Sequence, residues 1–225
     1  MKFNERLYVG NAEATPMSVM CNLGYRMPGN ATIMTNVKPN MKQVIAYECG
    51  YDGKMMRYFM GYVESYKQIN QGQYSLFCRE LVGALRNSLP VSIQHTTLKE
   101  LLTQVTTMTG LEFVSLDADY MNTPVPHVIN HGTGFALLDS LGDTFDIPKY
   151  LWQQMGDGRI FVGSWLDSMW YARNIPIAYD LISQASINTV EVPCMPQLRP
   201  GVMVNGQRVR TIQQNKNKML LTWMD

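Results

Sequence analysis

The sequence predicts a mainly β fold (β+α), in which strand-rich regions at both ends of the chain flank a middle α/β segment with two short helices. Three observations support this prediction. Aromatic and β-branched runs alternate with glycine-containing turns in both end regions. Helical periodicity bounded by capping residues occurs between them. A hydrophobic fraction of 46% over 225 residues is enough to bury a sizeable core.

Two turns organise the first strand-rich region. Apolar runs at residues 44–48 and 55–66 flank Asp52-Gly53, and this dipeptide predicts a tight hairpin because both residues tolerate a positive φ angle. A second turn at residues 70–72 separates the hairpin from a further apolar run. The region therefore predicts a three-stranded meander, and the prolines before it favour short strands and loops.

The clearest helix signal starts at Thr97, which forms a capping box with Glu100 three residues later. Gly110 is typical of the position just beyond a helix C-terminus. Apolar residues recur at helical spacing between these two ends: Leu98, Leu101, Leu102, Val105 and Met108. The sequence therefore predicts a helix between Thr97 and Gly110, followed by a strand at residues 111–114.

A second, shorter helix is predicted for residues 134–141, with Thr133 as its N-cap. Three apolar residues are expected to form its core face: Phe135, Leu138 and Leu141. Apolar runs at residues 150–154 and 159–163 then flank a glycine-containing turn at residues 156–158, which predicts a hairpin. The middle of the chain thus has the order helix, strand, helix, hairpin.

The C-terminal region returns to strands. Residues 187–192 alternate between apolar and polar side chains, and the prolines within residues 193–200 indicate a loop. Asn205-Gly206 lies between two apolar-rich runs and is a strong signal for a two-residue hairpin turn. Residues 219–223 predict a final strand.

The low charge and the high methionine content of the chain have two explanations. Charged residues make up only 16% of the chain, and its 17 methionines have flexible side chains that fill irregular contacts at interfaces. A methionine-rich core is the simpler explanation, because methionine side chains are commonly buried. The 19 basic and 18 acidic residues nearly cancel, so no strong field attracts nucleic acid or an anionic membrane. A basic group near the C-terminus is expected to lie on a solvated hairpin face: Arg208, Arg210, Lys216 and Lys218.

The four cysteines are far apart and form no C-x-x-C pair: Cys21, Cys49, Cys78 and Cys194. This pattern predicts free thiols in a reducing compartment rather than a disulfide framework. The N-terminal residues lack the apolar segment of a secretion signal, and no apolar run approaches the length of a membrane span. We therefore expect a soluble chain with no membrane partner.

Two groups of residues are candidates for metal binding or catalysis. His127 and His131 would share one face of a helix as metal ligands, with His95 as a third imidazole, but the surrounding prolines and glycines favour a loop without a metal. Asp117 and Asp119 would share one face of a strand, as a carboxylate pair for glycoside hydrolysis, but a solvated loop is the simpler interpretation. The sequence therefore predicts no metal site and no catalytic residue.

Motifs of other enzyme classes are missing. The sequence contains no G-x-S-x-G, H-E-x-x-H or P-loop pattern. Gly132-Thr133-Gly134 precedes a predicted helix but lacks the third glycine of a dinucleotide-binding motif. We therefore predict that the chain is not an enzyme and uses no cofactor.

Trp165, Trp170 and Tyr171 are aromatic residues close together in the sequence. Such residues can form a platform that binds sugar rings, or they can pack against the core or against a neighbouring subunit. These three are the candidate binding residues of the chain, either at an interface or in a platform.

Four stretches occur in a characteristic order. They are Phe-Met-Gly-Tyr-Val at residues 59–63 with the strand after it, the capped helix that ends in Thr-Gly-Leu at residues 97–111, the helix and hairpin at residues 134–163, and Pro-Gln-Leu-Arg-Pro-Gly at residues 196–201. Together they resemble the baseplate hub, or late control, proteins of contractile bacteriophage tails, to which the spike-base proteins of type VI secretion are related.

The resemblance implies a structural subunit that forms a homotrimer. In this family each subunit contributes two similar β-barrels to a ring that joins the tail tube to the central spike. Carried over to this chain, residues 1–90 form the first β-barrel-like domain, residues 91–165 the middle domain and residues 166–225 the second β-barrel-like domain.

The implied partners are further copies of the chain, the tail tube, the tail spike and other baseplate proteins, without sequence-specific nucleic acid. The implied location is the tail baseplate of the virion, after synthesis in the host cytoplasm. A near-neutral net charge is compatible with DNA passing through the ring lumen, because lumen and exterior charges can offset each other.

Two other functions remain open. Hub proteins are commonly longer, and many carry a fused spike or lytic domain that is not recognised here. The chain could instead be a carbohydrate-binding or adhesion module of a tail tip that uses the three aromatic residues. It could also be a small hydrolase that uses Asp117 and Asp119 with His127 or His131.

Overall fold

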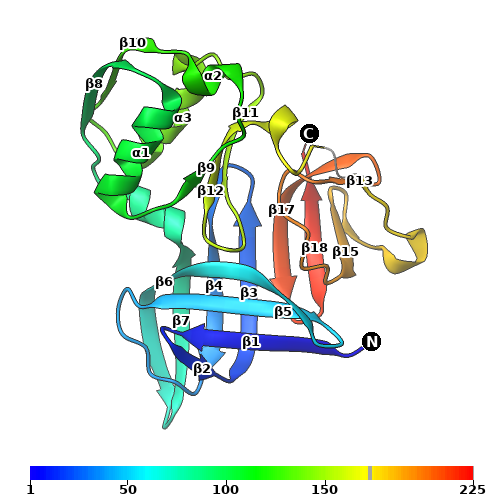
Figure 1. Ribbon diagram of the computed structural model, residues 1–225. Coiled ribbons are helices and arrows are strands. Elements are labelled where there is room, and N and C mark those ends of the chain that lie inside the picture. The colour runs from blue at the N-terminus through cyan, green and yellow to red at the C-terminus, as the bar shows by residue number, and fades with distance from the viewer. Residues whose placement is uncertain (172–173, 225) are drawn as a thin grey trace. The chain divides into compact units, whose positions relative to one another are not determined.

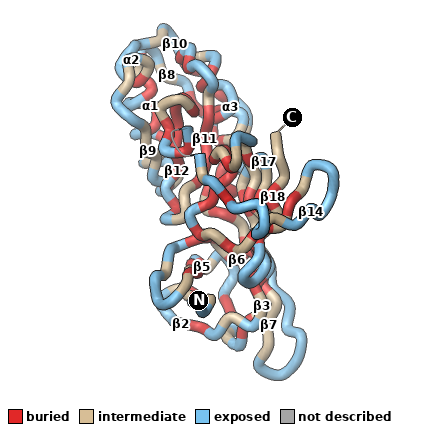
Figure 2. The backbone as a smooth tube through the Cα atoms, turned by 90° about the vertical axis from the view of Figure 1, so that its right-hand side faces the viewer, coloured by how far each residue is buried: buried red, intermediate tan, exposed pale blue. Residues whose placement is uncertain are grey.

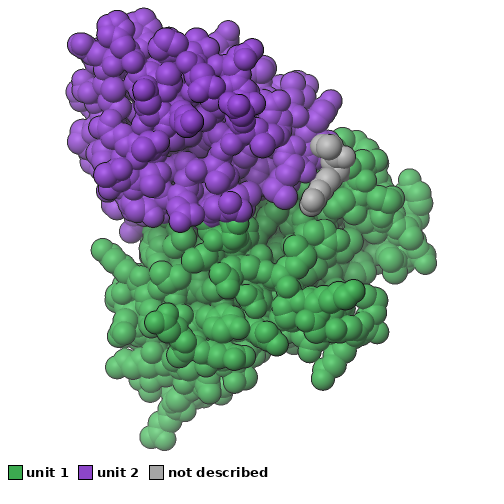
Figure 3. All heavy atoms as spheres, viewed as in Figure 1, with its two compact units in different colours: residues 1–81, 156–158, 173–225 green, residues 82–155, 159–172 purple. Residues whose placement is uncertain are grey.

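The computed structural model describes residues 1–171 and 174–224 and confirms the predicted mainly β fold (Figure 1). The chain divides into two compact units (Figure 3). Unit 1 contains the described residues of 1–81, 156–158 and 173–225, and unit 2 contains those of 82–155 and 159–172. Unit 1 thus combines the two end regions of the chain. The predicted division into three domains at residues 90 and 165 stays a prediction.

Unit 1 is built on one large sheet with the strand order β14-β15-β18-β17-β3-β4-β7-β6-β5-β1-β2, to which β13 and β16 are attached through β17. Neighbours along the main path are antiparallel. Its strands are β1 (Phe3–Val9), β2 (Ala12–Ala14), β3 (Pro16–Gly24), β4 (Met27–Thr35), β5 (Val44–Tyr51), β6 (Lys54–Asn70), β7 (Gln73–Glu80), β13 (Asn174–Ile175), β14 (Ser183–Ser186), β15 (Thr189–Pro193), β16 (Met203–Val204), β17 (Gln207–Asn215) and β18 (Lys218–Trp223).

Strands from the two ends of the chain meet where β3 pairs with β17. Leu23 lies opposite Ile212 in this antiparallel register, and both side chains are buried. The two strand-rich regions of the sequence therefore belong to one hydrogen-bonded sheet. The β-barrel-like closure of each region stays a prediction.

The long strand β6 changes partners along its length. Its first part pairs with β5 and its last part with β7, and the two pairings overlap at Gly61 and Tyr62. A Cβ atom on Gly61 would lie 2.1 Å from the carbonyl oxygen of Arg79. Glycine therefore permits the close backbone approach at the point where the strand passes from one partner to the other.

The predicted hairpin turns are confirmed. Asp52 and Gly53 have φ angles of 50° and 82°, and Asn205 and Gly206 have φ angles of 48° and 81°. Positive φ at both central positions gives a turn whose twist matches that of the flanking strands. The meander of β5, β6 and β7 and the hairpin of β16 and β17 therefore follow from local sequence.

Buried residues run along the strands of unit 1 (Figure 2). In β3 every second side chain is buried, namely Val19, Cys21 and Leu23, because successive side chains of a strand point to opposite faces. All four cysteines are buried free thiols, as their spacing in the sequence predicts. Each acts as a small apolar residue of the core.

Unit 2 combines helices with two small sheets. β8 pairs with β10, and the other sheet has the order β11-β12-β9. The pair of β8 and β10 and the short helix α2 have no counterpart among the predicted elements. The regular elements are β8 (Val91–Thr96), α1 (Leu98–Thr109), β9 (Phe113–Val114), α2 (Asp119–Asn122), β10 (Val125–Asn130), α3 (Gly134–Thr144), β11 (Tyr150–Gln154), β12 (Ile160–Ser164) and the 3-10 helix η2 (Trp165–Asp167).

Both predicted helices begin at their predicted N-caps. The Thr97 hydroxyl accepts a hydrogen bond from the Glu100 amide at 3.2 Å, and the Glu100 carboxylate accepts one from the Thr97 amide at 2.9 Å, which completes the capping box. Gly110 ends α1 with a φ angle of 72°. The Thr133 hydroxyl caps α3 by accepting a hydrogen bond from the Ala136 amide at 3.2 Å. No helix in the described ranges is long and apolar enough to cross a membrane.

The core face of α3 differs from the prediction at one residue. Leu138 and Leu141 are buried as predicted. Phe135 is only half-buried, and its ring stacks on the buried ring of Trp152, with the centroids 5.6 Å apart. The Trp152 indole also donates a hydrogen bond to the Asp139 carboxylate at 2.8 Å. Phe135 therefore covers the hairpin of β11 and β12 at the margin of the core.

Candidate functional site

The three candidate aromatic residues lie in the segment that follows β12. Trp165 and Trp170 are buried, whereas Tyr171 is 49% exposed. The Trp165 ring packs edge-on against Tyr171 with centroids 4.8 Å apart, and the Trp170 ring packs edge-on against Phe161 at 5.4 Å. The two tryptophans therefore contribute mainly to the core of unit 2, and Tyr171 presents the accessible ring. A role of the three residues in binding stays a prediction.

The candidate carboxylates do not alternate on a strand. Asp119 is the first residue of α2, so the predicted loop is wrong at this position. Asp117 lies in an exposed loop as predicted, and its carboxylate accepts a hydrogen bond from the Asn122 side chain at 3.3 Å. Since a helix begins between the two residues, they lack the shared strand face on which the carboxylate-pair hypothesis depends.

The candidate histidines are exposed residues of unit 2. His127 lies on β10 opposite Gln94 of β8, and its Nε2 atom is 3.2 Å from the Ser92 hydroxyl. The predicted loop is therefore wrong at His127, because pairing with β8 makes this segment a strand. Within residues 1–171 and 174–224, no three or more His, Cys, Asp or Glu side chains gather closely enough to hold a metal ion.

The Gly132-Thr133-Gly134 sequence has a packing role. Thr133 caps α3, and a Cβ atom on Gly134 would lie 2.7 Å from the side chain of Leu85. Glycine at position 134 therefore lets the first turn of α3 approach the segment that carries Leu85.

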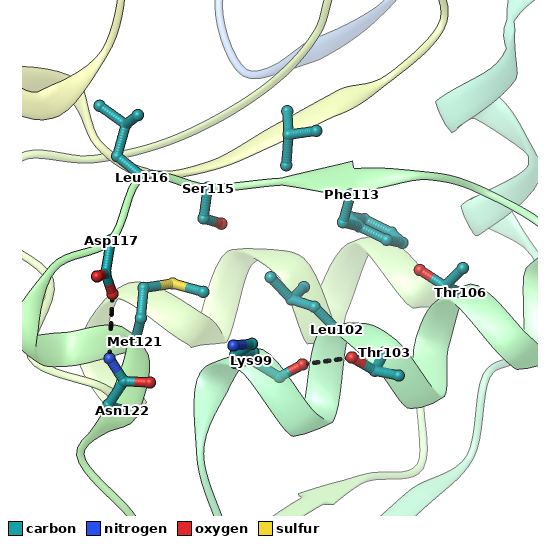
Figure 4. A pocket seen from close by; sticks show the side chains of 11 residues that line it. Lys99, Leu102, Thr103, Thr106, Phe113, Ser115, Leu116, Asp117, Met121 and Asn122 are labelled. Atoms are coloured by element: carbon teal, nitrogen blue, oxygen red, sulfur yellow. Dashed lines mark hydrogen bonds between the residues drawn. The ribbon is translucent and has the colours of Figure 1, made fainter.

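A hollow of about 500 Å³ lies on unit 2 between α1, α2 and the segment that continues β9 (Figure 4). Leu102 and Met121 contribute apolar surface to it, and Lys99 and Asp117 contribute one charge of each sign. Figure 4 shows Phe113 on the strand above the helix and Lys99 and Leu102 on the helix below.

A buried ionic cluster lies inside unit 1. The Glu80 carboxylate accepts a hydrogen bond from the Gly29 amide at 2.6 Å and lies 3.8 Å from the guanidinium of Arg199. Arg199 also donates to the Tyr58 carbonyl, and its guanidinium lies 4.8 Å from the centroid of the Tyr58 ring. Both charged residues are buried, so each depends on these partners to offset its loss of hydration.

Burial raises the pKa of Glu80 from 4.5 to about 7, although Arg199 and the Gly29 amide act in the opposite direction. The folded chain therefore holds a proton on Glu80 between pH 4.5 and 7 that the unfolded chain releases. We expect Glu80 to reduce the free energy of unfolding as pH rises through this window. The reduction should reach about 3 kcal/mol.

The Glu80→Gln variant should lose this contribution, because glutamine does not titrate. Urea unfolding of both proteins at pH 4.5 and above pH 7 gives, for each, the change in the free energy of unfolding with pH. The difference between the two changes is the contribution of Glu80. Other carboxylates titrate in both proteins and cancel in that difference. Equal pH dependences would contradict the raised pKa of Glu80.

Comparison with known proteins connects this fold to phage tails. Over 99% of its length the chain superposes on 97% of the 43 kDa tail protein of prophage MuSo2 from Shewanella oneidensis, with a TM-score of 0.72 and 9% sequence identity. The chain has the fold of a phage tail protein. It also shares this fold with the E. coli c3393 protein, a component of the type VI secretion system described as similar to the T4 tail proteins gp27 and gp5. That match covers 97% of this chain and 76% of the other, with a TM-score of 0.68 and 10% identity.

A sequence relative also comes from a phage. The chain is 30% identical over 194 residues to an uncharacterized 58.7 kDa protein of Haemophilus phage HP1, encoded in the lys 3′ region. The match covers 86% of this chain but 36% of the relative, so the chain spans about a third of that protein's length. No protein-family model matches the chain. The predicted likeness to hub and type VI secretion proteins is thereby confirmed at the level of the fold.

Arg199 of the buried ionic cluster is not among the residues that the sequence marks as candidates. It lies in the Pro-Gln-Leu-Arg-Pro-Gly loop at residues 196–201, whose composition suggests a solvated turn. In the structure Leu198 and Arg199 of this loop are both buried. An arginine in a loop that also resembles a family motif is the signal that could have drawn attention to it.

Proposed function

We propose that the chain is a structural subunit of a phage tail baseplate hub, which forms a trimeric ring between the tail tube and the central spike of the virion. The observation that carries this proposal is the fold shared, over nearly the whole chain, with the MuSo2 tail protein and with the type VI secretion component. The chain acts through its contacts with other copies, tube, spike and baseplate proteins, and it catalyses no reaction.

The surface of unit 1 supports a role in assembly. Four methionines on different parts of this unit are between 44% and 57% exposed: Met17, Met27, Met41 and Met56. Methionine adapts its shape to an irregular partner surface at low cost. The high methionine content of the chain is thus explained in part by exposed methionines. A methionine-rich core does not account for these four.

The proposal is tested on tail particles. Antibodies against the chain should label the end of the tail where tube and spike meet, as seen in electron micrographs of purified particles. Deletion of its gene should abolish complete tails, and supply of the chain from a plasmid should restore them. Complete particles without the chain would overturn the proposal, and binding of labelled glycans by the isolated chain would favour the carbohydrate-binding function.

A further inference from the structure

Residues 178–188, called the arm below, form an exposed segment of unit 1 that carries three large, exposed apolar side chains. The arm comprises the 3-10 helix η3 (Tyr179–Leu181), β14 and the turn after it, and every residue in it except Ile182 is exposed. Tyr179 is 85% exposed, Leu181 52% and Ile187 95%. Figure 2 shows the loop at β14 as a continuous exposed stretch. Such a group of large apolar side chains in water is typical of a surface that a partner covers.

The arm also carries a free edge of the sheet. β14 is the last strand in the order of unit 1, and among the described residues its outer edge pairs with no strand. Its residues Ser183, Gln184, Ala185 and Ser186 include neither lysine nor proline, which commonly protect such edges, although a bulge interrupts the register within it. A hollow of about 580 Å³ lies beside the arm, next to the ends of β17 and β18. The edge and the hollow together can receive a strand and a side chain of a partner.

The opposite end of the sheet offers a complementary surface, called the β2 surface below. It consists of β2, the loop at residues 36–43 and Val44, the first residue of β5. The Gly10 amide, in the turn between β1 and β2, donates to the Val44 carbonyl at 2.7 Å, so Val44 lies beside that turn. Met41 and Val44 are exposed apolar residues of this surface. β2 ends the strand order on this side, so it is the second free edge of the sheet among the described residues.

Charge distinguishes the two surfaces. The arm contains one charged residue, Asp180, for a net charge of −1. The β2 surface contains Lys38, Lys42 and Glu13, so two positive charges and one negative charge give a net charge of +1. Two arms would repel each other, whereas an arm and a β2 surface attract. The occupant that fits the arm is therefore a different part of the same protein, presented by a second copy.

We infer that the arm of one copy docks on the β2 surface of the next copy, with β14 beside β2 and Ile187 against the apolar residues of that surface. This inference rests on the proposed trimeric hub and names the contact that closes it. Because the two surfaces differ, the contact is head-to-tail, and such contacts produce a closed ring when the rotation between copies returns to the first one. Main-chain pairing would supply affinity, and the charges would fix the orientation.

The first experiment measures the mass of the full chain in solution by sedimentation velocity. Ile187→Lys places a positive charge against the lysines of the β2 surface and should convert trimers into monomers with an unchanged circular dichroism spectrum. Ile69→Lys is the matched control, because Ile69 is 50% exposed on β6 but lies outside both surfaces. This control should retain the wild-type mass. An Ile187→Lys chain with the wild-type mass would overturn the inference.

The second experiment tests which surfaces meet. In a chain with both Ala12→Cys and Ala185→Cys, a short thiol-reactive cross-linker should join copies into dimers and trimers, because both positions are exposed and the four native cysteines are buried. Either single variant should give no cross-linked trimers. If the double variant forms no cross-links at the highest attainable protein concentration, the inference is overturned. This holds also if the double variant is a monomer like the wild-type chain. If the same double variant still enters tails at the labelled position, the proposed function stands and only the docking contact fails.

Discussion

Replacement of Arg199 by methionine is expected to lower the free energy of unfolding by about 3–5 kcal/mol above pH 7, where Glu80 is ionised. Methionine keeps much of the side-chain volume, but it offers no charge to Glu80 and no donor to the Tyr58 carbonyl. One buried carboxylate would then lack its counterion. Urea unfolding followed by circular dichroism measures the loss.

Arg57→Met is the matched control for this prediction. Arg57 pairs with Glu48 at 3.1 Å, but its side chain is 41% exposed, so the cost of removing it should stay within about 1 kcal/mol. The cost of Arg199→Met should also fall below pH 7, because Glu80 then takes up a proton and no longer needs a counterion. A cost for Arg199→Met no larger than for Arg57→Met would show that the buried pair adds nothing to stability.

Replacement of Trp152 by alanine is expected to destabilise the chain by about 3–5 kcal/mol through loss of the core of unit 2. The Trp152 side chain is buried at 2% exposure, stacks on Phe135 and donates to Asp139. Alanine leaves a cavity behind the hairpin of β11 and β12 and removes the ring that Phe135 covers. Urea unfolding gives the size of the effect, and near-ultraviolet circular dichroism reports the loosened aromatic packing.

Trp152→Phe separates packing from hydrogen bonding at the same position. Phenylalanine keeps an aromatic ring against Phe135 but loses the hydrogen bond to Asp139, and the expected cost of that bond is about 1 kcal/mol. If alanine and phenylalanine destabilise the chain equally, the hydrogen bond rather than the buried ring carries the contribution of Trp152.

Elements with local determinants can be predicted from this sequence. Asp52-Gly53 adopts the positive φ angles that its residue types permit, and Thr97 and Glu100 form their capping box within a single turn. Strand pairs with distant partners are a different case. β8 and β10 pair with each other although α1 lies between them in the sequence, and nothing within either strand specifies its partner. The loop expected at His127 is therefore a strand, because a neighbour distant in the sequence supplies its hydrogen bonds.

The candidate site shows the same division between local and distant causes. Trp165 and Trp170 are recognisable as important aromatic residues, but sequence does not distinguish a buried ring from an exposed platform because both use the same side chains. The burial of Arg199 is even harder to predict from sequence. Its burial depends on Glu80 and Tyr58, which belong to β7 and β6, far from Arg199 in the sequence. Proline and arginine in one loop locally favour solvent, and the distant carboxylate reverses that preference.

The pairing of β3 with β17 has a consequence for protein synthesis. β17 lies far downstream of β3 in the sequence, so β3 receives its second neighbour only after all the residues between the two strands have been translated. Closing a loop of this length slows folding, and until then the nascent chain displays an open strand edge that can pair with the wrong molecule. Unit 2 lies entirely between these strands in the sequence, so it can fold before the β3 edge is paired. Protection of the nascent β3 edge, by a chaperone or by fast translation of the last strands, would therefore set the yield of correctly folded subunits.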